Sequence, residues 1–161
     1  MELYFVEHTL RGRLAIATRP RGGDWLQDDL KRLGMYRVGL LVSMLTPEES
    51  RELQLEEEGR LAADLQLSFL SVPVNDRSLP SQVNEFGLAA KQVASFVDHG
   101  GAVAVHCRMG IGRSSLFCGS VLVGLGVAPK DAWNLLEKCR GRAVPDTPEQ
   151  RAWLFDYHAR L

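Results

Sequence analysis

The sequence Val103-Ala-Val-His-Cys107-Arg-Met-Gly110-Ile-Gly112-Arg113-Ser-Ser runs from an apolar strand pattern through a glycine-containing loop into a helical pattern. A loop of this kind points successive backbone N–H groups, together with the N-terminus of the helix, at a single point. Gly110 and Gly112 tolerate positive φ, which a tightly wrapped loop requires. The segment therefore predicts an anion site at the end of a strand in an α/β sheet.

The chemistry of this loop differs from that of an ATP-binding loop. It lacks the Gly-Lys-Ser/Thr ending, and a cysteine stands at its start. Cys107, at the focus of the N–H dipoles, is expected to exist partly as a thiolate, which is a nucleophile for phosphoryl transfer. Arg113 can return to the mouth of the loop, where its planar guanidinium matches the equatorial oxygens of a transferring phosphoryl group. These residues predict a phosphate site that contains a nucleophile.

Outside the loop, short apolar runs alternate with helical patterns, which is typical of an α/β domain. The expected strands are residues 3–6, 14–17, 38–45, 67–74 and 102–106. The expected helices are residues 24–33 (closed by Gly34), one that starts at a Thr46 cap, and residues 80–99, 113–125, 129–140 and 147–160. The Glu-rich residues 48–58 are interpreted as the solvated face of a helical region. We predict one domain, residues 1–161, with a central, largely parallel sheet flanked by helices.

Composition limits the partners and the compartment. The 161 residues carry 19 Lys+Arg and 20 Asp+Glu, a net charge of −1. Such a chain has no bulk electrostatic reason to bind nucleic acid or an anionic membrane, so the anion site must be local. Three cysteines are too few, and odd in number, for a disulfide framework, and they fit a reducing compartment. The longest apolar run, residues 121–128, is far shorter than the ~20 residues of a membrane helix. We expect a cytoplasmic protein without membrane insertion.

The order His-Cys-x5-Arg-Ser, here His106 to Ser114, resembles the signature loop of the cysteine-dependent protein tyrosine and dual-specificity phosphatases. From Gly12 to the C-terminus the chain is similar to the small cyclin-dependent-kinase-inhibitor-3-like (kinase-associated) phosphatases and their bacterial relatives. Rhodanese loops usually place the final arginine one residue sooner, and low-molecular-weight tyrosine phosphatases carry the loop near the N-terminus. The resemblance implies a protein phosphatase that needs no cofactor or metal. It implies hydrolysis of phosphotyrosine, with phosphoserine and phosphothreonine as further substrates, through a phospho-cysteine.

The resemblance also implies roles for the residues of the loop. Cys107 would be the nucleophile, and Ser114 would hydrogen-bond its sulfur and help it leave when the phospho-cysteine is hydrolysed. His106 would support the loop and the thiolate without transferring a proton. The phosphate-binding loop would consist of Arg108, Met109, Gly110, Ile111, Gly112 and Arg113.

A general acid must protonate the leaving oxygen. The family places an Asp for this purpose on a mobile loop that follows a strand upstream of the cysteine. The segment Val72-Pro-Val-Asn-Asp76-Arg-Ser-Leu-Pro80 stands at that place and resembles that loop. Asp76 is therefore the expected acid, whereas Asp98 fits a surface position at the end of a helix.

Gln150 has two interpretations. In Thr147-Pro-Glu-Gln150 it completes a capping box, which accounts for it without any functional role. In tyrosine-specific members of the family, a glutamine in a comparable C-terminal segment positions the hydrolytic water. The capping box is the interpretation that needs fewer assumptions.

Other functions stay open at this point. The loop could bind a phosphoprotein without turnover if Asp76 were misplaced. A phosphoinositide or other small phosphomonoester is a second alternative, because Arg108 matches a basic residue of the lipid phosphatases, although Ile111 stands where they carry another. A sulfur-transfer or arsenate-reducing enzyme would use Cys107 as a redox nucleophile. It would need a resolving thiol, and Cys118, expected inside an apolar helix, is the nearest in sequence.

Overall fold

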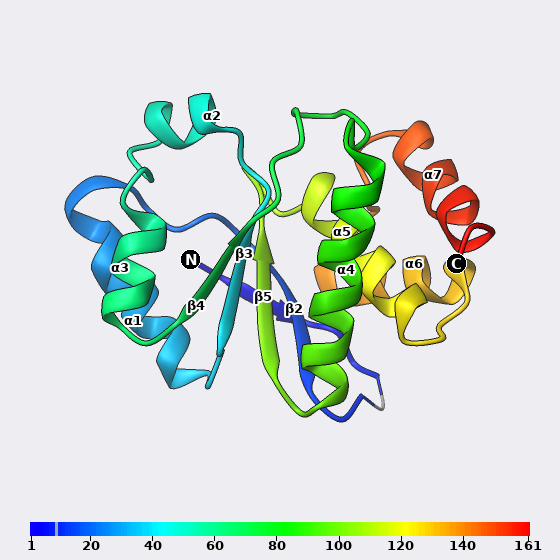
Figure 1. Cartoon of the computed structure of the whole chain (residues 1–161), viewed down its shortest axis with the longest axis horizontal. Coiled ribbons are helices and arrows are strands. Elements are labelled where there is room, and N and C mark those ends of the chain that lie inside the picture. The colour runs from blue at the N-terminus through cyan, green and yellow to red at the C-terminus, as the bar shows by residue number, and fades with distance from the viewer. Residues whose placement is uncertain (9) are drawn as a thin grey trace.

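A five-stranded sheet with the order β1-β2-β5-β3-β4 forms the centre of the protein (Figure 1). The computed structural model describes residues 1–8 and 10–161. Neighbouring strands are parallel except that β1 is antiparallel to β2. The strands are β1 (Leu3–Phe5), β2 (Arg13–Ala17), β3 (Leu40–Ser43), β4 (Ser68–Ser71) and β5 (Ala102–His106). The prediction of a largely parallel central sheet is confirmed.

Strand β5 occupies the middle of the sheet and leads into the glycine-containing loop. Its last residue, His106, pairs with Ala17 of β2 on one side and with Ser43 of β3 on the other. All of its residues are buried, as expected for a parallel strand that is covered on both faces. Cys107 therefore emerges at the carboxyl edge of the sheet, where sheets of this kind bind ligands.

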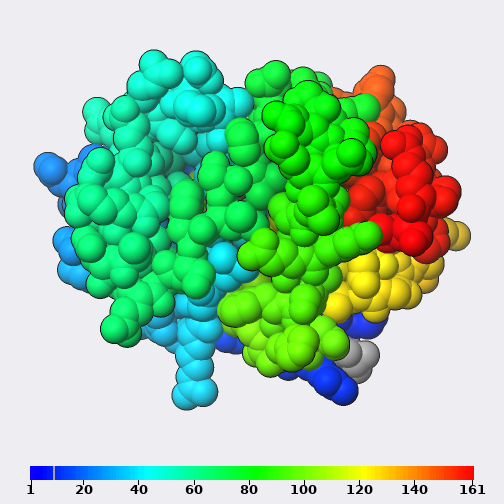
Figure 2. Space-filling model, in the orientation of Figure 1, coloured from blue at the N-terminus to red at the C-terminus, as the bar shows by residue number. Residues whose placement is uncertain are grey.

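Helices cover both faces of the sheet (Figure 1). One face packs against α1 and α3, and the other packs against α4, α5, α6 and α7. In the space-filling view, the segment from α3 to α4, which includes the edge strand β4, forms much of the surface on this side (Figure 2). The helices are η1 (Gly23–Trp25), α1 (Leu26–Met35), α2 (Pro47–Glu52), α3 (Glu58–Asp64), α4 (Val83–Asp98), α5 (Arg113–Gly124), α6 (Pro129–Arg140) and α7 (Pro148–His158).

Helix α5 is the central helix of the larger core. Every residue from Arg113 to Val123 is buried, which confirms the expectation of a helix packed on several sides. The ring of Phe86 on α4 contacts Phe117 of α5 and Trp153 of α7 edge-on, each with a centroid distance of 5.2 Å. This packing fixes the helix whose first turn follows the loop.

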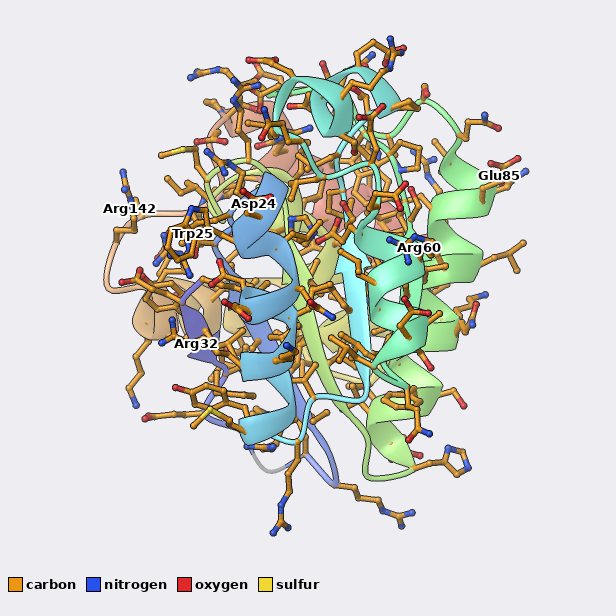
Figure 3. All side chains as sticks on the ribbon, turned by 90° about the vertical axis from the view of Figure 1, so that its left-hand side faces the viewer. Asp24, Trp25, Arg32, Arg60, Glu85 and Arg142 are labelled. Atoms are coloured by element: carbon orange, nitrogen blue, oxygen red, sulfur yellow. The ribbon has the colours of Figure 1, made fainter. Side chains whose placement is uncertain are left out.

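Two local signals are confirmed at helix ends. Thr46 caps α2 in a complete capping box with Glu49, and Pro47 occupies the first turn. Gly141 ends α6 in the left-handed conformation, with φ 63°. The outward faces of α1 and α3 carry charged side chains such as Arg32 and Arg60 (Figure 3). No helix in the described part of the chain is both long enough and apolar enough to cross a membrane.

Helix α1 differs from the prediction at its end. It continues through Gly34 to Met35, because the left-handed position that reverses the chain is taken by Arg37, with φ 55°. The N–H groups of Arg37 and Val38 donate to the carbonyls of Gly34 and Leu33 and close the turn.

The Glu-rich segment also differs from the prediction, because it forms two helices. Helix α2 ends at Glu52, the chain turns through Gln54 at φ 56°, and α3 begins at Glu58. Two of its acidic side chains, Glu49 and Glu58, face the protein interior and make long-range contacts there. The interpretation of this whole segment as a solvated face was wrong.

Strands β3 and β4 are shorter than predicted. The apolar pattern continues past both strands because the residues beyond them stay buried, and the N–H groups of Met44 and Val72 still donate to the carbonyls of His106 and Ser43. The buried residues beyond the strands are Met44, Leu45, Val72 and Val74.

Candidate active site

The sulfur of Cys107 lies inside the loop, and the residue is 3% exposed. The backbone N–H of Gly110 donates to Sγ at 3.3 Å, and the hydroxyl oxygen of Ser114 lies 3.3 Å from the same sulfur. Donors aimed at a sulfur stabilise negative charge on it. The structure therefore places the predicted nucleophile and the predicted hydroxyl in direct contact.

One of the two loop glycines, Gly110, is required by its positive φ and by a close approach to backbone, whereas Gly112 has φ −83°. A Cβ on Gly110, which has φ 67°, would lie 2.6 Å from the carbonyl oxygen of Ala17. A Cβ on Gly112 would lie 2.1 Å from a carboxylate oxygen of Asp146. Asp146 is exposed and its side chain can move, so the wrapping of the loop depends on the missing side chain at Gly110.

Arg113 is 1% exposed and is held by acceptors from three segments; one of these acceptors is the Met44 carbonyl, 3.4 Å from Nη1. Its Nη1 donates to Glu49 Oε2 at 2.6 Å and to the carbonyl of Val74 at 2.8 Å, and its Nη2 donates to Glu49 Oε1 at 2.9 Å. A bidentate pair of this kind fixes the guanidinium plane. The arginine therefore enters the site in one orientation.

Glu49 was not among the residues singled out from the sequence. Its carboxylate accepts from the Thr46 N–H at 3.0 Å, which completes the capping box, and it also binds Arg113. Burial acts to raise the pKa of Glu49, but the hydrogen bonds from Arg113 and from the Thr46 backbone outweigh it and lower the pKa. The capping-box pattern is enough to explain a glutamate at position 49. Its contact with Arg113 therefore leaves no separate signal in the sequence.

The structure brings Asp76 to the site. Its side chain is 55% exposed, and Oδ1 lies 3.0 Å from Nη2 of Arg113. The loop turns sharply after it, with Arg77 at φ 55° and the Ser78 N–H donating to the Asn75 carbonyl at 3.1 Å. The acid predicted upstream thus lies beside the arginine of the loop.

Gln150 contacts the loop that carries Asp76. Its Nε2 donates to the carbonyl oxygen of Ser78 at 3.1 Å, and the side chain is fully buried. Thr147 does cap α7 by accepting from the Gln150 N–H at 3.1 Å. The amide does not return to the Thr147 backbone, so the expected capping box is only half formed. The tertiary contact with Ser78 holds the side chain instead.

The side chains of the loop itself point away from the sulfur or toward other partners. Arg108 forms an ion pair with Glu52 at the rim, where its Nη2 lies 2.7 Å from Oε1. Met109 is 63% exposed, whereas Ile111 packs against the core. The loop offers its backbone, not these side chains, to an anion.

Arg140 is a further contact that the sequence reasoning missed. Its Nε donates to the Gly110 carbonyl at 2.7 Å, and its guanidinium lies 3.9 Å from the ring centroid of Tyr4. Arg140 therefore holds the outer side of the loop from the end of α6. In sequence it reads as an ordinary basic residue in the last turn of a helix.

His106 is completely buried beneath the loop. Its Nδ1 lies 3.4 Å from the carbonyl oxygen of Cys107, and its Nε2 lies 3.0 Å from Oε1 of Glu58 on α3. Glu58 was another residue missed from the sequence, because it stands in a run of acidic residues that otherwise face solvent.

Cys118 lies one helical turn after Ser114 in α5. Burial raises the pKa of the Cys118 thiol well above its ordinary value, and the other two cysteines act in the same direction. All three cysteines are free thiols. A thiol that is buried and protonated is a poor attacking group.

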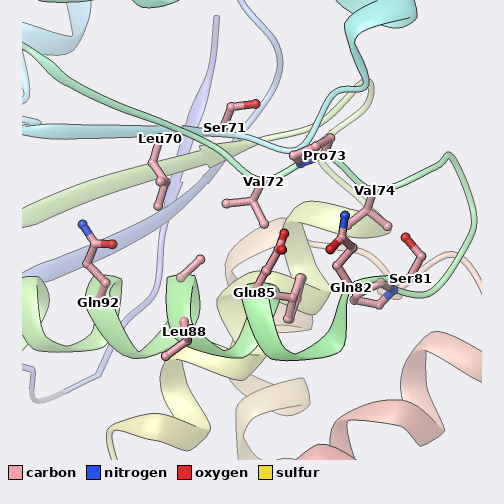
Figure 4. A pocket seen from close by; sticks show the side chains of 13 residues that line it. Leu70, Ser71, Val72, Pro73, Val74, Ser81, Gln82, Glu85, Leu88 and Gln92 are labelled. Carbon is pink, nitrogen blue, oxygen red and sulfur yellow. The ribbon is translucent and has the colours of Figure 1, made fainter.

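A hollow of about 440 Å³ lies beside the Asp76 loop, between β4 and α4 (Figure 4). The residues that line it include Leu70, Val72, Pro80, Glu85 and Leu88. Cys107 and Arg113 are not among its lining residues. The hollow therefore adjoins the acid loop and is separate from the anion site.

Comparison with known proteins identifies the family. The family model described as the dual specificity phosphatase catalytic domain matches residues 48–160. No curated protein sequence matches the chain.

Three solved structures illustrate the likeness of fold. Kinase associated phosphatase, with its catalytic cysteine replaced by serine, is 17% identical with a TM-score of 0.88, covering 100% of this chain and 96% of that one. The active form of Tk-PTP is 22% identical with a TM-score of 0.79, covering 99% and 97%. PTPMT1 in complex with PI(5)P is 18% identical with a TM-score of 0.77, covering 93% and 92%.

The family match spans well over half of the chain and includes the loop around Cys107. The likeness of fold extends over 96% and 97% of the first two of these structures. The chain belongs to the dual-specificity phosphatase family and is a phosphatase enzyme.

Proposed function

We propose that this phosphatase hydrolyses phosphomonoesters on proteins through a covalent phospho-cysteine on Cys107. Phosphotyrosine is its first substrate class, and phosphoserine and phosphothreonine are the second. One observation carries the proposal. The Cys107 sulfur accepts from the Gly110 N–H at 3.3 Å inside a loop whose arginine, Arg113, lies 3.0 Å from the carboxylate of Asp76. The groups proposed as nucleophile, phosphate-binding group and proton donor thus lie together, which supports the proposal.

In the first step the Cys107 thiolate attacks phosphorus in line with the leaving oxygen. The S–P bond forms as the P–O bond breaks, and protonated Asp76 donates its proton to the leaving oxygen. Arg113 and the N–H groups of the loop hold the equatorial oxygens, where charge is greatest in the transition state. A phosphoryl group bound by Arg113 would lie within reach of the Asp76 carboxyl.

In the second step water attacks the phospho-cysteine. Asp76, now a carboxylate, takes a proton from the water, and the S–P bond breaks to release inorganic phosphate and the thiolate. The Ser114 hydroxyl, 3.3 Å from the sulfur, donates to it as negative charge returns. No step requires a metal ion or an organic cofactor.

The surroundings of the site support a protein substrate over a phosphoinositide. Arg108 is engaged in an ion pair with Glu52 at the rim, and Ile111 is partly buried and packs against the core. A polyanionic inositol headgroup would need free cations at those positions. Burial of Cys118 within α5 likewise weighs against sulfur transfer or arsenate reduction, which need an accessible resolving thiol.

Three free thiols support a reducing compartment such as the cytoplasm, where structural disulfides are rare. A phosphorylated cytoplasmic protein is accordingly the proposed partner.

The deciding experiment is rapid-mix hydrolysis of an aryl phosphate in EDTA, with Cys107→Ser as the matched variant. We expect a burst of phenol stoichiometric with enzyme, absent in the variant, followed by turnover of phosphotyrosine peptides. Binding of vanadate without turnover would replace this proposal with a phosphoprotein-binding module. A requirement for a divalent metal would contradict the mechanism.

A further inference from the structure

A buried carboxyl group lies beneath the nucleophile, on the far side of His106. Glu58 is the first residue of α3, and its side chain is 2% exposed. Along β5, Val103 and Val105 pack against the α4–α5 core, whereas Ala104 packs against the α1–α3 core. Because side chains alternate along a strand, His106 points toward α3, where Glu58 meets it.

The burial of Glu58 needs an explanation. Leu55 and Ala62, its neighbours in the chain, belong to the apolar core on this face of the sheet. A carboxyl group is costly there unless it is paired. Oε1 of Glu58 and Nε2 of His106 lie 3.0 Å apart, and neither atom makes a hydrogen bond in the described structure. The contact with His106 therefore explains why the carboxyl group of Glu58 is buried.

The arrangement requires two hydrogens. One hydrogen lies between Glu58 Oε1 and His106 Nε2, and the other lies between His106 Nδ1 and the carbonyl oxygen of Cys107. Without a hydrogen, a lone pair on the nitrogen would face a lone pair on the oxygen in each contact. A neutral imidazole carries only one N–H. The second hydrogen comes with Glu58, either as an imidazolium–carboxylate pair or as a carboxylic acid that donates to Nε2. In both forms the pair is neutral overall, as burial favours, and Nδ1 carries a hydrogen that faces Cys107.

We propose that Glu58 is a positioning residue for the phosphatase reaction, which holds the His106 ring so that Nδ1–H faces the carbonyl of Cys107 and fixes the start of the nucleophile's loop. This inference rests on the proposed role of Cys107 as the nucleophile. It explains why an acidic residue occupies an apolar face of the fold. The carboxylate acts through the histidine and touches neither substrate nor sulfur.

Two variants of Glu58 separate positioning from space filling. Glu58→Met keeps the length of the side chain and suits the apolar surroundings, but it offers no partner to Nε2. We expect kcat to fall about tenfold or more, since a buried donor or acceptor loses its partner. KM for an aryl phosphate should stay within about twofold, because Arg113 and the loop N–H groups bind the phosphate. Glu58→Gln should recover most of the activity, since its amide N–H can donate to Nε2 and keep the hydrogen on Nδ1.

Glu57 provides the matched control one position away. Its side chain is 61% exposed and pairs with Arg60 on the outer surface of α3, where Figure 3 shows Arg60 at the surface. Glu57→Met removes a carboxylate from the same helix end without touching His106. Its kcat should equal that of the wild type.

The decisive readout is alkylation of Cys107 by iodoacetate, measured on the Cys107 peptide by mass spectrometry, alongside turnover. Glu58→Met should slow alkylation, Glu58→Gln should largely restore it, and in a His106→Asn background Glu58→Met should have no further effect. Equal losses with and without His106, or wild-type kcat and alkylation in folded Glu58→Met, would overturn the inference. Alkylation does not require turnover. A wild type that fails to hydrolyse the aryl phosphate would therefore contradict the proposed function while the role of Glu58 is still tested.

Discussion

The carboxylate of Glu49 receives both terminal nitrogens of Arg113, at 2.6 and 2.9 Å, although 64 residues separate the two in the chain. The contact joins the first turn of α2 to the first turn of α5. Because the guanidinium must present a fixed plane to a phosphoryl group, this ion pair orients the phosphate-binding group before substrate arrives.

Replacement of Glu49 by Gln should therefore weaken both stability and catalysis. One partner of a largely buried ion pair is lost, and we expect a loss of about 1–3 kcal/mol in the free energy of unfolding. We also expect kcat/KM to fall about tenfold, with KM rising because Arg113 is free to turn. Urea denaturation and steady-state kinetics measure the two effects. Glu52→Gln is the control, since its exposed pair with Arg108 contributes about 0–1 kcal/mol. Equal effects of the two changes would contradict a positioning role for Glu49.

Replacement of Asp76 by Asn should reduce kcat by about 10²–10⁴-fold when the leaving group is a poor one. The amide cannot donate a proton to the leaving oxygen. Phosphotyrosine peptides should suffer more than an aryl phosphate whose phenol is acidic, because an acidic phenol leaves without help. The test is to measure the loss of kcat in Asp76→Asn on each of the two substrates and to compare the losses. Asp98→Asn, at the end of α4, should be silent, and a uniform loss on both substrates would argue against Asp76 as the acid.

Replacement of Gln150 by Met should loosen the loop that carries Asp76. The hydrogen bond to the Ser78 carbonyl disappears, which corresponds to about 0.5–1.5 kcal/mol. We expect kcat to fall about three- to tenfold, with vanadate affinity unchanged, because the anion site itself is intact. Vanadate titration and kinetics test this together. Glu149→Met, on the adjacent exposed position, is the control. Loss of vanadate binding in Gln150→Met would show that the glutamine acts on the loop of Cys107 instead.

Protonation of Asp29, a carboxylate outside the active site, should lower the stability of the protein in acid. Asp29 is buried, accepts hydrogen bonds from Arg21 and forms an ion pair with the N-terminal ammonium group. Burial acts to raise its pKa, but these partners outweigh burial and lower the pKa from 3.8 to about 2.

A carboxylate with a lowered folded-state pKa stabilises the protein above its unfolded pKa and loses that contribution as the pH falls through the folded value. Urea midpoints should therefore drop between pH 4 and pH 2 in the wild type. In Asp29→Asn the overall stability should be lower and this part of the pH dependence should be missing. An unchanged slope in that variant would contradict the assignment to Asp29.

Much of the fold and of the loop follows from local sequence. The glycine positions, the apolar strand before Cys107 and the all-apolar α5 are patterns of neighbouring residues, and each predicted its element with errors of a few residues. The capping box at Thr46 and the stop at Gly141 are local in the same sense, because backbone groups near the ends of a helix are satisfied by residues three or four positions away.

The residues that hold the site residues in place could be identified only from the tertiary structure. Glu49 and Glu58 belong to an acidic run that resembles any solvated helix face, yet one binds Arg113 and the other meets His106. Arg140 likewise reads as an ordinary helix-end residue, although it holds Gly110, and neither interpretation of Gln150 from the sequence includes its contact with Ser78. Their partners lie 30 to 72 residues away. Hydrogen bonds of this kind depend on which surfaces the packed helices bring together, and periodicity along the chain carries no information about that.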